Sequence, residues 1–394
     1  MEPIRTQALV FALVASLICI CIAVAGCGKP PSPVPVDDTG DAPATTAPLS
    51  PAQQKLQSMT LEQKVAQLFI IRPEQIVDVK TVTAAGEATQ KALQENPVGG
   101  ICYFGKNLED PDQTREMLTN VQRYSMESSG IPLFLCVDEE GGVVARVSNN
   151  RHFGIINPGN MSDLGATGDV AAARETGERM GAYLADLGFN VDFAPVADVW
   201  SNPANTVVAT RSFGSDPQLV AQMALALGQG LESKGVTAVY KHFPGHGSTV
   251  QDSHDGYALV DKSLAELQEC DLVPFQAAID DGAGWIMVGH LSVPQITGDD
   301  TPASLSYAVC TKLLREQMGF KGIIVTDGLD MGAIVNMYGS GEAAVLALEA
   351  GVDVLLLPAD YYEAYEAVLE AVRSGRISEQ RLDESVLRIL EAKM

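Results

Sequence analysis

Short runs of apolar residues recur along the chain from residue 51 onward, and longer segments with helical spacing separate them. The eight runs are rich in Val, Ile and Phe and span Leu68–Ile71, Gly100–Phe104, Leu133–Val137, Val191–Val196, Val236–Tyr240, Trp285–Val288, Gly322–Val325 and Val352–Leu357. Near-continuous apolar strands are typical of parallel pairing, in which both faces of the sheet are buried. Residues 170–189 and 216–235 have the apolar period of amphipathic helices, and Gly235 is placed to end the second. The pattern predicts eight parallel strands that alternate with helices.

Two α/β architectures contain such an alternation, a closed (β/α)8 TIM-type barrel and an open doubly wound sheet. A nucleotide-binding doubly wound sheet carries a Gly-rich turn after its first strand, whereas this chain reads Ile71-Arg72-Pro73-Glu74 there. Eight strand and helix units therefore favour a single (β/α)8 barrel over residues 51–394.

The first 50 residues differ in composition from the predicted barrel. Residues 8–25 are apolar and uncharged, and they end in Val24-Ala25-Gly26-Cys27, which resembles the bacterial lipobox. We expect residues 1–26 to be a lipoprotein signal peptide and Cys27 to carry the lipid; an uncleaved membrane anchor is the alternative. Residues 27–50 are rich in proline and are expected to form an extended linker. Both alternatives imply an exported, extracytoplasmic protein held at a bacterial membrane.

Composition and charge limit the classes of molecule that this chain can bind. Hydrophobic residues make up 46% of the chain and charged residues 19%, which is enough apolar material for a large core. The 50 acidic residues outnumber the 26 basic ones, and the net charge of −24 argues against a nucleic-acid partner. The cysteines of the barrel region lack metal-binding spacing and are expected to be buried small apolar residues, with a disulfide left open; they are Cys102, Cys136, Cys270 and Cys310.

Ionisable residues follow five successive apolar runs. They are Asp138-Glu139-Glu140 after the third run, Asp198 after the fourth, Lys241-His242 after the fifth, His290 after the sixth and Asp327 after the seventh. Any one of them alone would more often cap a helix or satisfy a buried hydrogen bond. Because the active site of a TIM barrel forms at the carboxyl ends of its strands, the five together predict an active site.

Four of the five histidines lie after the fifth and sixth runs, where they suit either a metal site or acid–base catalysis. His242 and His246 have the spacing of a helical metal pair, but Pro244 and Gly245 between them break a helix. We therefore predict no metal and no cofactor. In Asp252-Ser253-His254, an extended backbone would project the carboxylate and the imidazole to one side, so that Asp252 orients His254; a surface turn is the alternative.

Several motifs together resemble glycoside hydrolase family 3. They are KHFPGHGSTVQDSH (241–254), VDEEGG (137–142) with Arg146, FAPVADV (193–199), RSFGSDP (211–217), PASLS (302–306) and VTDGLDMGAI (325–334). The resemblance runs from about residue 55 to the end and is closest to the β-N-acetylglucosaminidase (β-N-acetylhexosaminidase) branch that acts on peptidoglycan fragments. It implies a retaining enzyme with Asp327 as nucleophile and His254, paired with Asp252, as acid/base.

The resemblance also implies a set of substrate-binding residues. Asp138, Arg146, Arg211, Lys241 and His242 would contact the sugar hydroxyls and the N-acetyl group. Asp198 and His290 would either join them or support the barrel mouth through ion pairs. Val143 stands where related sequences often have arginine, and Trp200 and Ala209-Thr210 also depart from the usual pattern, which bears on recognition of the leaving group.

These observations predict a monomeric, lipid-anchored exo-β-N-acetylglucosaminidase that hydrolyses terminal GlcNAc from peptidoglycan-derived glycans through a covalent glycosyl-enzyme. The chain ends soon after its last helical segment, which favours this branch over two-domain glucosidases of the family. The alternatives are a phosphorylase of β-N-acetylglucosaminides, a β-glucosidase of the same family, and a lipoprotein that binds sugars without turning them over.

Overall fold

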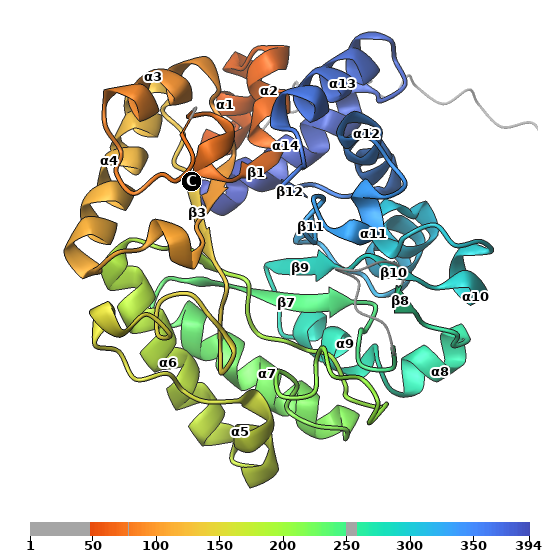
Figure 1. Ribbon diagram of the computed structural model, residues 1–394. Helices are drawn as coiled ribbons and strands as arrows, with labels where there is room; N and C mark the ends of the chain where they lie inside the picture. Colours follow the sequence, from red (N-terminus) through yellow and green to blue (C-terminus); the bar gives the residue numbers. More distant parts are fainter. Residues whose placement is uncertain (1–47, 78, 250–257) are drawn as a thin grey trace, which may run out of the picture. The chain divides into compact units, whose positions relative to one another are not determined.

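Eight parallel strands form a ring at the centre of the fold, and helices surround it in Figure 1. The computed structural model describes residues 48–77, 79–249 and 258–394. The strands are β1 (Phe69–Ile71), β2 (Gly100–Cys102), β3 (Phe134–Val137), β6 (Val191–Asp192), β7 (Thr237–Phe243), β9 (Trp285–Val288), β11 (Ile323–Thr326) and β12 (Leu355–Leu356). They follow the order β11-β9-β7-β6-β3-β2-β1-β12. A bridge between Val325 and Val354 joins β11 to β12, so the predicted (β/α)8 barrel is confirmed.

Two helices precede β1, and the others lie between or after the strands of the ring, which the helices surround. They are α1 (Pro51–Ser58), α2 (Leu61–Gln67), α3 (Glu87–Glu95), α4 (Pro111–Ser129), α5 (Met161–Thr167), α6 (Val170–Leu187), α7 (Pro217–Glu232), α8 (Leu264–Glu269), α9 (Val273–Asp280), α10 (Pro294–Thr297), the π-helix η5 (Ala308–Gln317), α11 (Gly332–Val335), α12 (Ser340–Ala350), α13 (Tyr361–Arg373) and α14 (Glu379–Lys393). No helix in the described part of the chain is long and apolar enough to cross a bilayer.

Local sequence explains the ends of the two helices that periodicity predicts. The Asp169 side chain accepts a hydrogen bond from the N–H of Ala172 at the start of α6, and Asp216 caps α7 in the same way. Helix α6 ends at Leu187, and Gly188 follows it with a φ of +100°, which only glycine readily adopts. Helix α7 ends at Glu232, earlier than predicted, and Gly235 follows with a φ of +80°.

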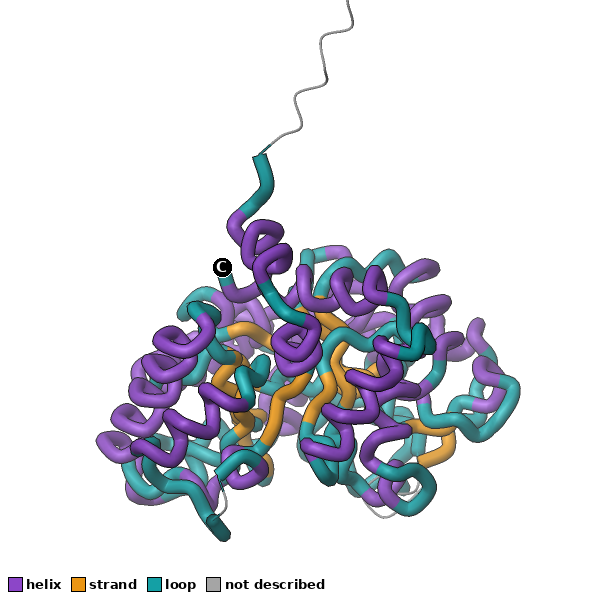
Figure 2. The backbone as a smooth tube through the Cα atoms, turned by 90° about the horizontal axis from the view of Figure 1, so that it is seen from above, coloured by secondary structure: helices purple, strands orange, loops and turns teal. Residues whose placement is uncertain are grey.

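The core lies both inside the ring and between the ring and its helices, as the edge-on view of Figure 2 shows for the enclosed strands. Inside, the rings of Phe134 and Trp285 meet edge to face with centroids 4.7 Å apart. On the outside, Phe243 of β7 packs against Phe275 of α9 at 5.3 Å. Burial on both faces explains why the strands appear in the sequence as uninterrupted apolar runs.

The four cysteines of the barrel carry free thiols, so no disulfide joins them. Cys102 and Cys136 are paired in register on β2 and β3, and they are buried, as is Cys310 in η5; Cys270 at the end of α8 is half-buried. The predicted signal peptide, Cys27 and the linker up to residue 47 lie outside the described residues. Helix α1 begins at Pro51 with Ser50 as its N-cap.

Candidate active site

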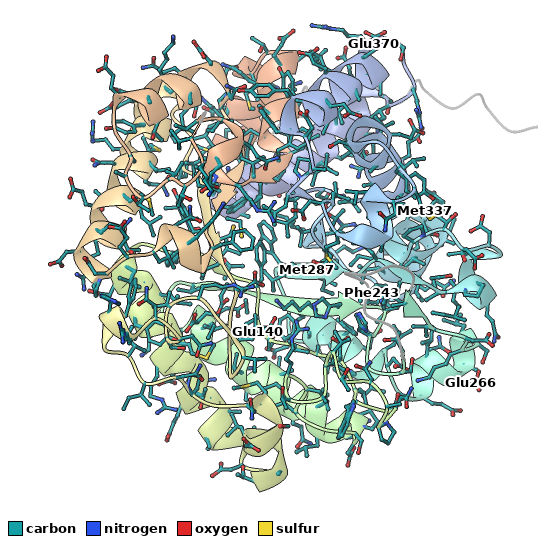
Figure 3. The ribbon with its side chains drawn as sticks, viewed as in Figure 1. Glu140, Phe243, Glu266, Met287, Met337 and Glu370 are labelled. Carbon is teal, nitrogen blue, oxygen red and sulfur yellow. The ribbon has the colours of Figure 1, made fainter. Side chains whose placement is uncertain are left out.

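A cavity of about 420 Å³ opens at the carboxyl ends of the strands. Its lining contains most of the polar residues predicted from the strand ends, together with apolar residues from neighbouring strands and loops. The side chains that line it include Arg72, Phe104, Asp138, Glu140, Arg146, Arg211, Lys241, His242, Met287, Asp327, Asp330 and Met331. Glu140 and Met287 lie near the middle of the barrel in Figure 3. The barrel fold therefore gathers residues from distant parts of the sequence into one pocket at the strand ends.

Asp327 lies directly after β11 and faces this cavity. Its own N–H donates to the carbonyl oxygen of Val288 on β9 at 2.9 Å, and its Oδ1 accepts the N–H of Gly328 at 2.8 Å. Burial disfavours its charged form, but His242, His290, the N–H of Gly328 and Lys241 together outweigh burial and hold the pKa of Asp327 below its ordinary value. The side chain is therefore an ionised carboxylate at neutral pH, suited to act as a nucleophile.

A chain of alternating charges also lines the pocket. Lys241 Nζ lies 2.8 Å from Asp138 Oδ1 and 2.6 Å from Glu140 Oε1. Arg211 donates two hydrogen bonds to the same Glu140, from Nε to Oε2 at 2.7 Å and from the terminal nitrogen to Oε1 at 2.8 Å. Two parallel bonds of this kind fix the guanidinium in position and in orientation. The network thus presents donors of Lys241 and Arg211 to the cavity in a rigid arrangement.

Mutual attraction keeps this network charged. Burial opposes the charge of Glu140, yet Arg211 and Lys241 lower the pKa of Glu140 far below its ordinary value. In the same way, burial opposes the charge of Lys241, but Asp138 and Glu140 raise the pKa of Lys241 well above its usual value. Cationic donors fixed beside a cavity form stronger hydrogen bonds to hydroxyl and carbonyl oxygens than neutral donors do.

Asp198 lies behind His242 and does not line the cavity. Its Oδ2 is 2.7 Å from His242 Nδ1, and its Oδ1 accepts the backbone N–H of His242 at 3.2 Å and of His246 at 2.7 Å. Burial opposes its charge, but His242 lowers the pKa of Asp198, so the carboxylate accepts from Nδ1–H. His242 then turns Nε2 toward Arg211, 3.4 Å away. Of the two roles that the sequence leaves open for Asp198, the geometry favours support of a pocket residue.

His290 is also fully buried and supports the pocket from behind. Its Nε2 lies 2.8 Å from the carbonyl oxygen of Gly328, the residue after Asp327, and its Nδ1 is 2.7 Å from the hydroxyl of Ser304. A carbonyl oxygen only accepts hydrogen bonds, so Nε2 carries a proton. His290 thereby fixes the backbone beside Asp327.

A short hairpin brings Arg146 to the pocket. Strands β4 (Glu139–Gly141) and β5 (Val144–Ala145) pair antiparallel, and Gly141 and Gly142 between them have φ values of +91° and +56°, which glycine adopts without strain. After the turn, the N–H of Arg146 donates to the carbonyl oxygen of Asp138 at 3.2 Å. Its terminal nitrogen lies 3.9 Å from Asp138 Oδ2.

The sequence prediction omitted several pocket residues. Glu140 could have been found, because residues two apart in an extended segment point the same way, as Asp138 does, while Glu139 points into the core and accepts from the N–H of Val147. Arg72 could have been found as well, since it directly follows β1. Its guanidinium stacks 4.8 Å from the ring centre of Phe104.

The predicted pair of Asp252 and His254 lies outside the described residues. Within the described ranges, no group of three or more His, Cys, Asp or Glu side chains could hold a metal ion. His242 is bound to Asp198, and Nδ1 of His246 lies 2.8 Å from the hydroxyl of Thr249.

Comparison with known proteins identifies related sequences and structures. The family model described as "Glycosyl hydrolase family 3 N terminal domain" matches residues 60–392. Beta-hexosaminidase A of Pseudoalteromonas piscicida is 36% identical over 321 residues, which cover 75% of this chain and 53% of that protein. Beta-hexosaminidase LpqI of Mycobacterium tuberculosis is 38% identical over 271 residues, covering 67% of this chain and 68% of that one.

A solved structure of a family 3 enzyme is also similar to this chain. The glycoside hydrolase family 3 beta-N-acetylglucosaminidase from Paenibacillus sp. superposes with a TM-score of 0.80 at 40% identity, covering 85% of this chain and 62% of that chain. This chain therefore spans about half of the Pseudoalteromonas relative. The resemblance that the sequence motifs indicate is confirmed by these matches.

Proposed function

The chain belongs to glycosyl hydrolase family 3, and from this premise we propose that it is an exo-β-N-acetylglucosaminidase that hydrolyses terminal GlcNAc with retention of configuration. The observation that carries the proposal is the carboxylate of Asp327, which faces the cavity at the end of β11 and whose pKa the surrounding groups hold below its ordinary value. A cavity of about 420 Å³ suits one sugar ring with its N-acetyl group, as an exo-acting enzyme requires.

In the first step, an oxygen of the Asp327 carboxylate attacks the anomeric carbon and forms a glycosyl ester. The bond from that carbon to the glycosidic oxygen breaks, and the imidazolium of His254 protonates the departing oxygen. In the second step, His254 removes a proton from water, the water oxygen attacks the anomeric carbon, and the ester bond breaks to regenerate Asp327. Two inversions at one carbon give net retention.

The charged network binds the sugar before these steps. Lys241 and Arg211 donate to ring hydroxyl or N-acetyl oxygens, and Asp138 accepts from hydroxyl groups. Since Asp138, Lys241, Glu140 and Arg211 are already fixed to one another, little side-chain freedom is lost when the sugar binds. This preorganisation holds the anomeric carbon in front of Asp327.

The proposal also covers the location of the protein and its natural substrate. The lipobox-like Cys27 and the apolar residues 8–25 support an exported lipoprotein whose barrel is held at a bacterial membrane. A glycosidase in that position meets cell-wall glycans, so we propose peptidoglycan fragments with terminal GlcNAc as the substrate class. The protein acts as a monomer without a cofactor in this proposal.

An activity screen with a trapping step tests the function. The wild type is incubated with 4-nitrophenyl β-GlcNAc, with the matching glucoside, and with each in the presence of phosphate. We expect release of nitrophenol from the GlcNAc substrate and free β-GlcNAc as the first product by NMR. A 5-fluoro-N-acetylglucosaminyl fluoride should label Asp327, as seen by peptide mass spectrometry.

Variants separate catalysis from binding. Asp327→Asn should lose activity by at least about 1,000-fold without unfolding. Asp112→Asn serves as the matched control, because its carboxylate on α4 is 98% exposed, and it should keep full activity. GlcNAc 1-phosphate as the main product would replace hydrolysis by phosphorolysis, and preference for the glucoside would indicate a glucosidase. Binding of GlcNAc without any turnover would refute the enzyme.

A further inference from the structure

Two cysteines lie side by side inside the barrel, and neither takes part in the proposed reaction. Cys102 of β2 and Cys136 of β3 are partners in the parallel register. Residues two apart in a strand share a face, so Cys136 points the same way as Phe134, whose ring meets Trp285 inside the barrel. Its register partner Cys102 shares that face, is 1% exposed and belongs to the lining of the active-site cavity. The two thiols therefore meet in the interior, beside the cavity.

Both thiols are free and lack polar partners. Neither sulfur forms a hydrogen bond with a residue that the structure describes, whereas Sγ of Cys310 donates to the carbonyl oxygen of Ala303 at 3.3 Å. Burial raises the pKa of both thiols well above the ordinary value, so both are protonated at neutral pH. The pair thus offers two soft sulfur ligands that have no hydrogen bond to lose.

The strand register sets the separation of the two side chains. Neighbouring strands lie about 4.8 Å apart, and side chains that project in parallel keep about this distance. A disulfide needs Cβ atoms about 3.8 Å apart, so the register disfavours one. A metal ion between two opposed thiolates, with metal–sulfur bonds of about 2.3 Å, spans about 4.6 Å from sulfur to sulfur. The pair therefore fits a linear, two-coordinate ion without movement of the backbone.

The ligand set limits which ion binds. Within the described ranges, no group of three or more His, Cys, Asp or Glu side chains could hold a metal, so a zinc ion would lack its four ligands. Soft thiolates select Cu(I), and Ag(I) has the same charge and the same preference for two sulfur ligands. Two thiols and no third ligand therefore favour a monovalent thiophilic cation.

Charges around the pair offset the charge of such a complex. Binding of one monovalent ion releases both thiol protons to solvent, so the ion and its two thiolates carry one net negative charge. The cations that act on the two sulfurs outnumber the carboxylates; they are Arg72, Arg146 and Lys241 near Cys102 and Lys393 near Cys136, against Asp138 and Asp192. The surroundings therefore favour an anionic complex over a neutral cavity floor.

We propose that Cys102 and Cys136 form a binding site for one monovalent thiophilic cation of the Cu(I) class at the floor of the active-site cavity. The ion enters through the cavity, because Cys102 lines it. It takes no part in the reaction, and its presence at the floor obstructs a bound sugar. The binding site does not depend on the proposed function, whereas its effect on hydrolysis does.

Counting bound ions tests whether the two thiols share one. The reduced, metal-free full chain is titrated with Ag(I) in chloride-free buffer, and the silver that remains bound after gel filtration is measured. We expect Cys102→Ser, Cys136→Ser and the double variant each to bind one silver ion fewer than the wild type. A double variant that loses two ions would show two separate sites, and a single variant that loses none would show that its thiol is no ligand; either result overturns the pair.

Controls address the fold and the need for two thiols. Cys310→Ser removes a thiol that is equally buried but has no cysteine neighbour in register, so it should keep the wild-type count. An equally tight ion lost in Cys310→Ser would contradict the requirement for a pair. Alanine variants of Cys102 and Cys136 repeat the count without a buried hydroxyl, and thermal unfolding checks that each variant is folded.

Hydrolysis of 4-nitrophenyl β-GlcNAc tests the effect of the ion on the cavity. Ag(I) should lower the rate of the wild type at least about tenfold, and that of Cys136→Ser, relative to its own rate without silver, by about twofold at most. Equal inhibition of the two proteins would overturn the placement of the ion at the cavity floor. A wild type without glycosidase activity would overturn the proposed function, while the silver count still decides on the site.

Discussion

Replacing Glu140 by glutamine tests the charged network of the pocket most directly. The change keeps the size of the side chain and removes one negative charge that is 1% exposed. Arg211 then loses its bidentate partner, and Lys241 keeps Asp138 as its remaining carboxylate at 2.8 Å. Two largely buried cations therefore share one acidic partner in place of two.

The expected loss of stability follows from burial. Removing one partner of a buried ion pair costs about 3–5 kcal/mol, since an uncompensated charge remains in the interior. The glutamine oxygen still accepts one hydrogen bond, so we place Glu140→Gln at the lower end, about 3 kcal/mol. Burial raises the pKa of Glu140, but Arg211 and Lys241 outweigh burial and lower this pKa below its ordinary value of 4.5. Folding therefore favours the ionised form. Its contribution is therefore fully present above about pH 4.5 and declines as the pH falls further.

Urea unfolding at pH 7 and at pH 3.5 measures both effects. Glu127→Gln is the matched control, because Glu127 pairs with Arg123 on the surface of α4, where the two side chains are 47% and 49% exposed. An exposed pair contributes about 0–1 kcal/mol. A deficit in Glu140→Gln no larger than that of the control at pH 7, or one of the same size at both pH values, would contradict the reasoning.

Three further predictions concern the positioning of His242 by Asp198, the pH dependence of stability, and the effect of removing metal ions. Asp198→Asn should lower kcat/KM about 10- to 100-fold and shift the imidazole NMR signals of His242, because the Nδ1 acceptor at 2.7 Å is lost; unchanged signals would argue against a positioning role. Burial lowers the pKa of Lys393 to about 7, so the unfolded chain binds the proton more tightly and stability should rise from pH 7 toward 10, by up to about 1.4 kcal/mol per pH unit; in Lys393→Met, urea unfolding should lack this rise. Activity on aryl β-GlcNAc should survive EDTA, and a loss that zinc reverses would instead indicate a histidine metal site.

The barrel was predictable from the sequence because burial on both faces makes each strand a nearly continuous apolar run. All eight apolar runs became strands of the ring, since a central parallel strand has no exposed face for polar residues. The short pairs β4–β5 and β8 (Ala258–Leu259) with β10 (Leu291–Ser292) were not predicted. These four strands have two or three residues each and, unlike the short strands of the ring, they lie outside the eight apolar runs, so their own sequence has no pattern to detect.

The site was predictable to the level of strand ends, and less so for individual side chains. Asp138, Arg146, Arg211, Lys241, His242 and Asp327 line one cavity, while the roles that the resemblance implies for them stay predictions. Asp198 and His290 lie behind it, a distinction that depends on which way each side chain turns after its strand. Arg72 pairs with Asp330, far away in sequence, and such long-range partners leave no local pattern.

The charge of the whole chain and the charge of the pocket have different consequences for the substrate. Four carboxylates line the cavity, and four cations stand against them: Asp138, Glu140, Asp327 and Asp330 with Arg72, Arg146, Arg211 and Lys241. A nearly neutral pocket suits an uncharged terminal sugar, which needs fixed hydrogen bonds more than attraction from a distance. The net charge of −24 is therefore carried by residues outside the pocket, and the pocket selects its sugar through fixed hydrogen bonds rather than through the charge of the chain.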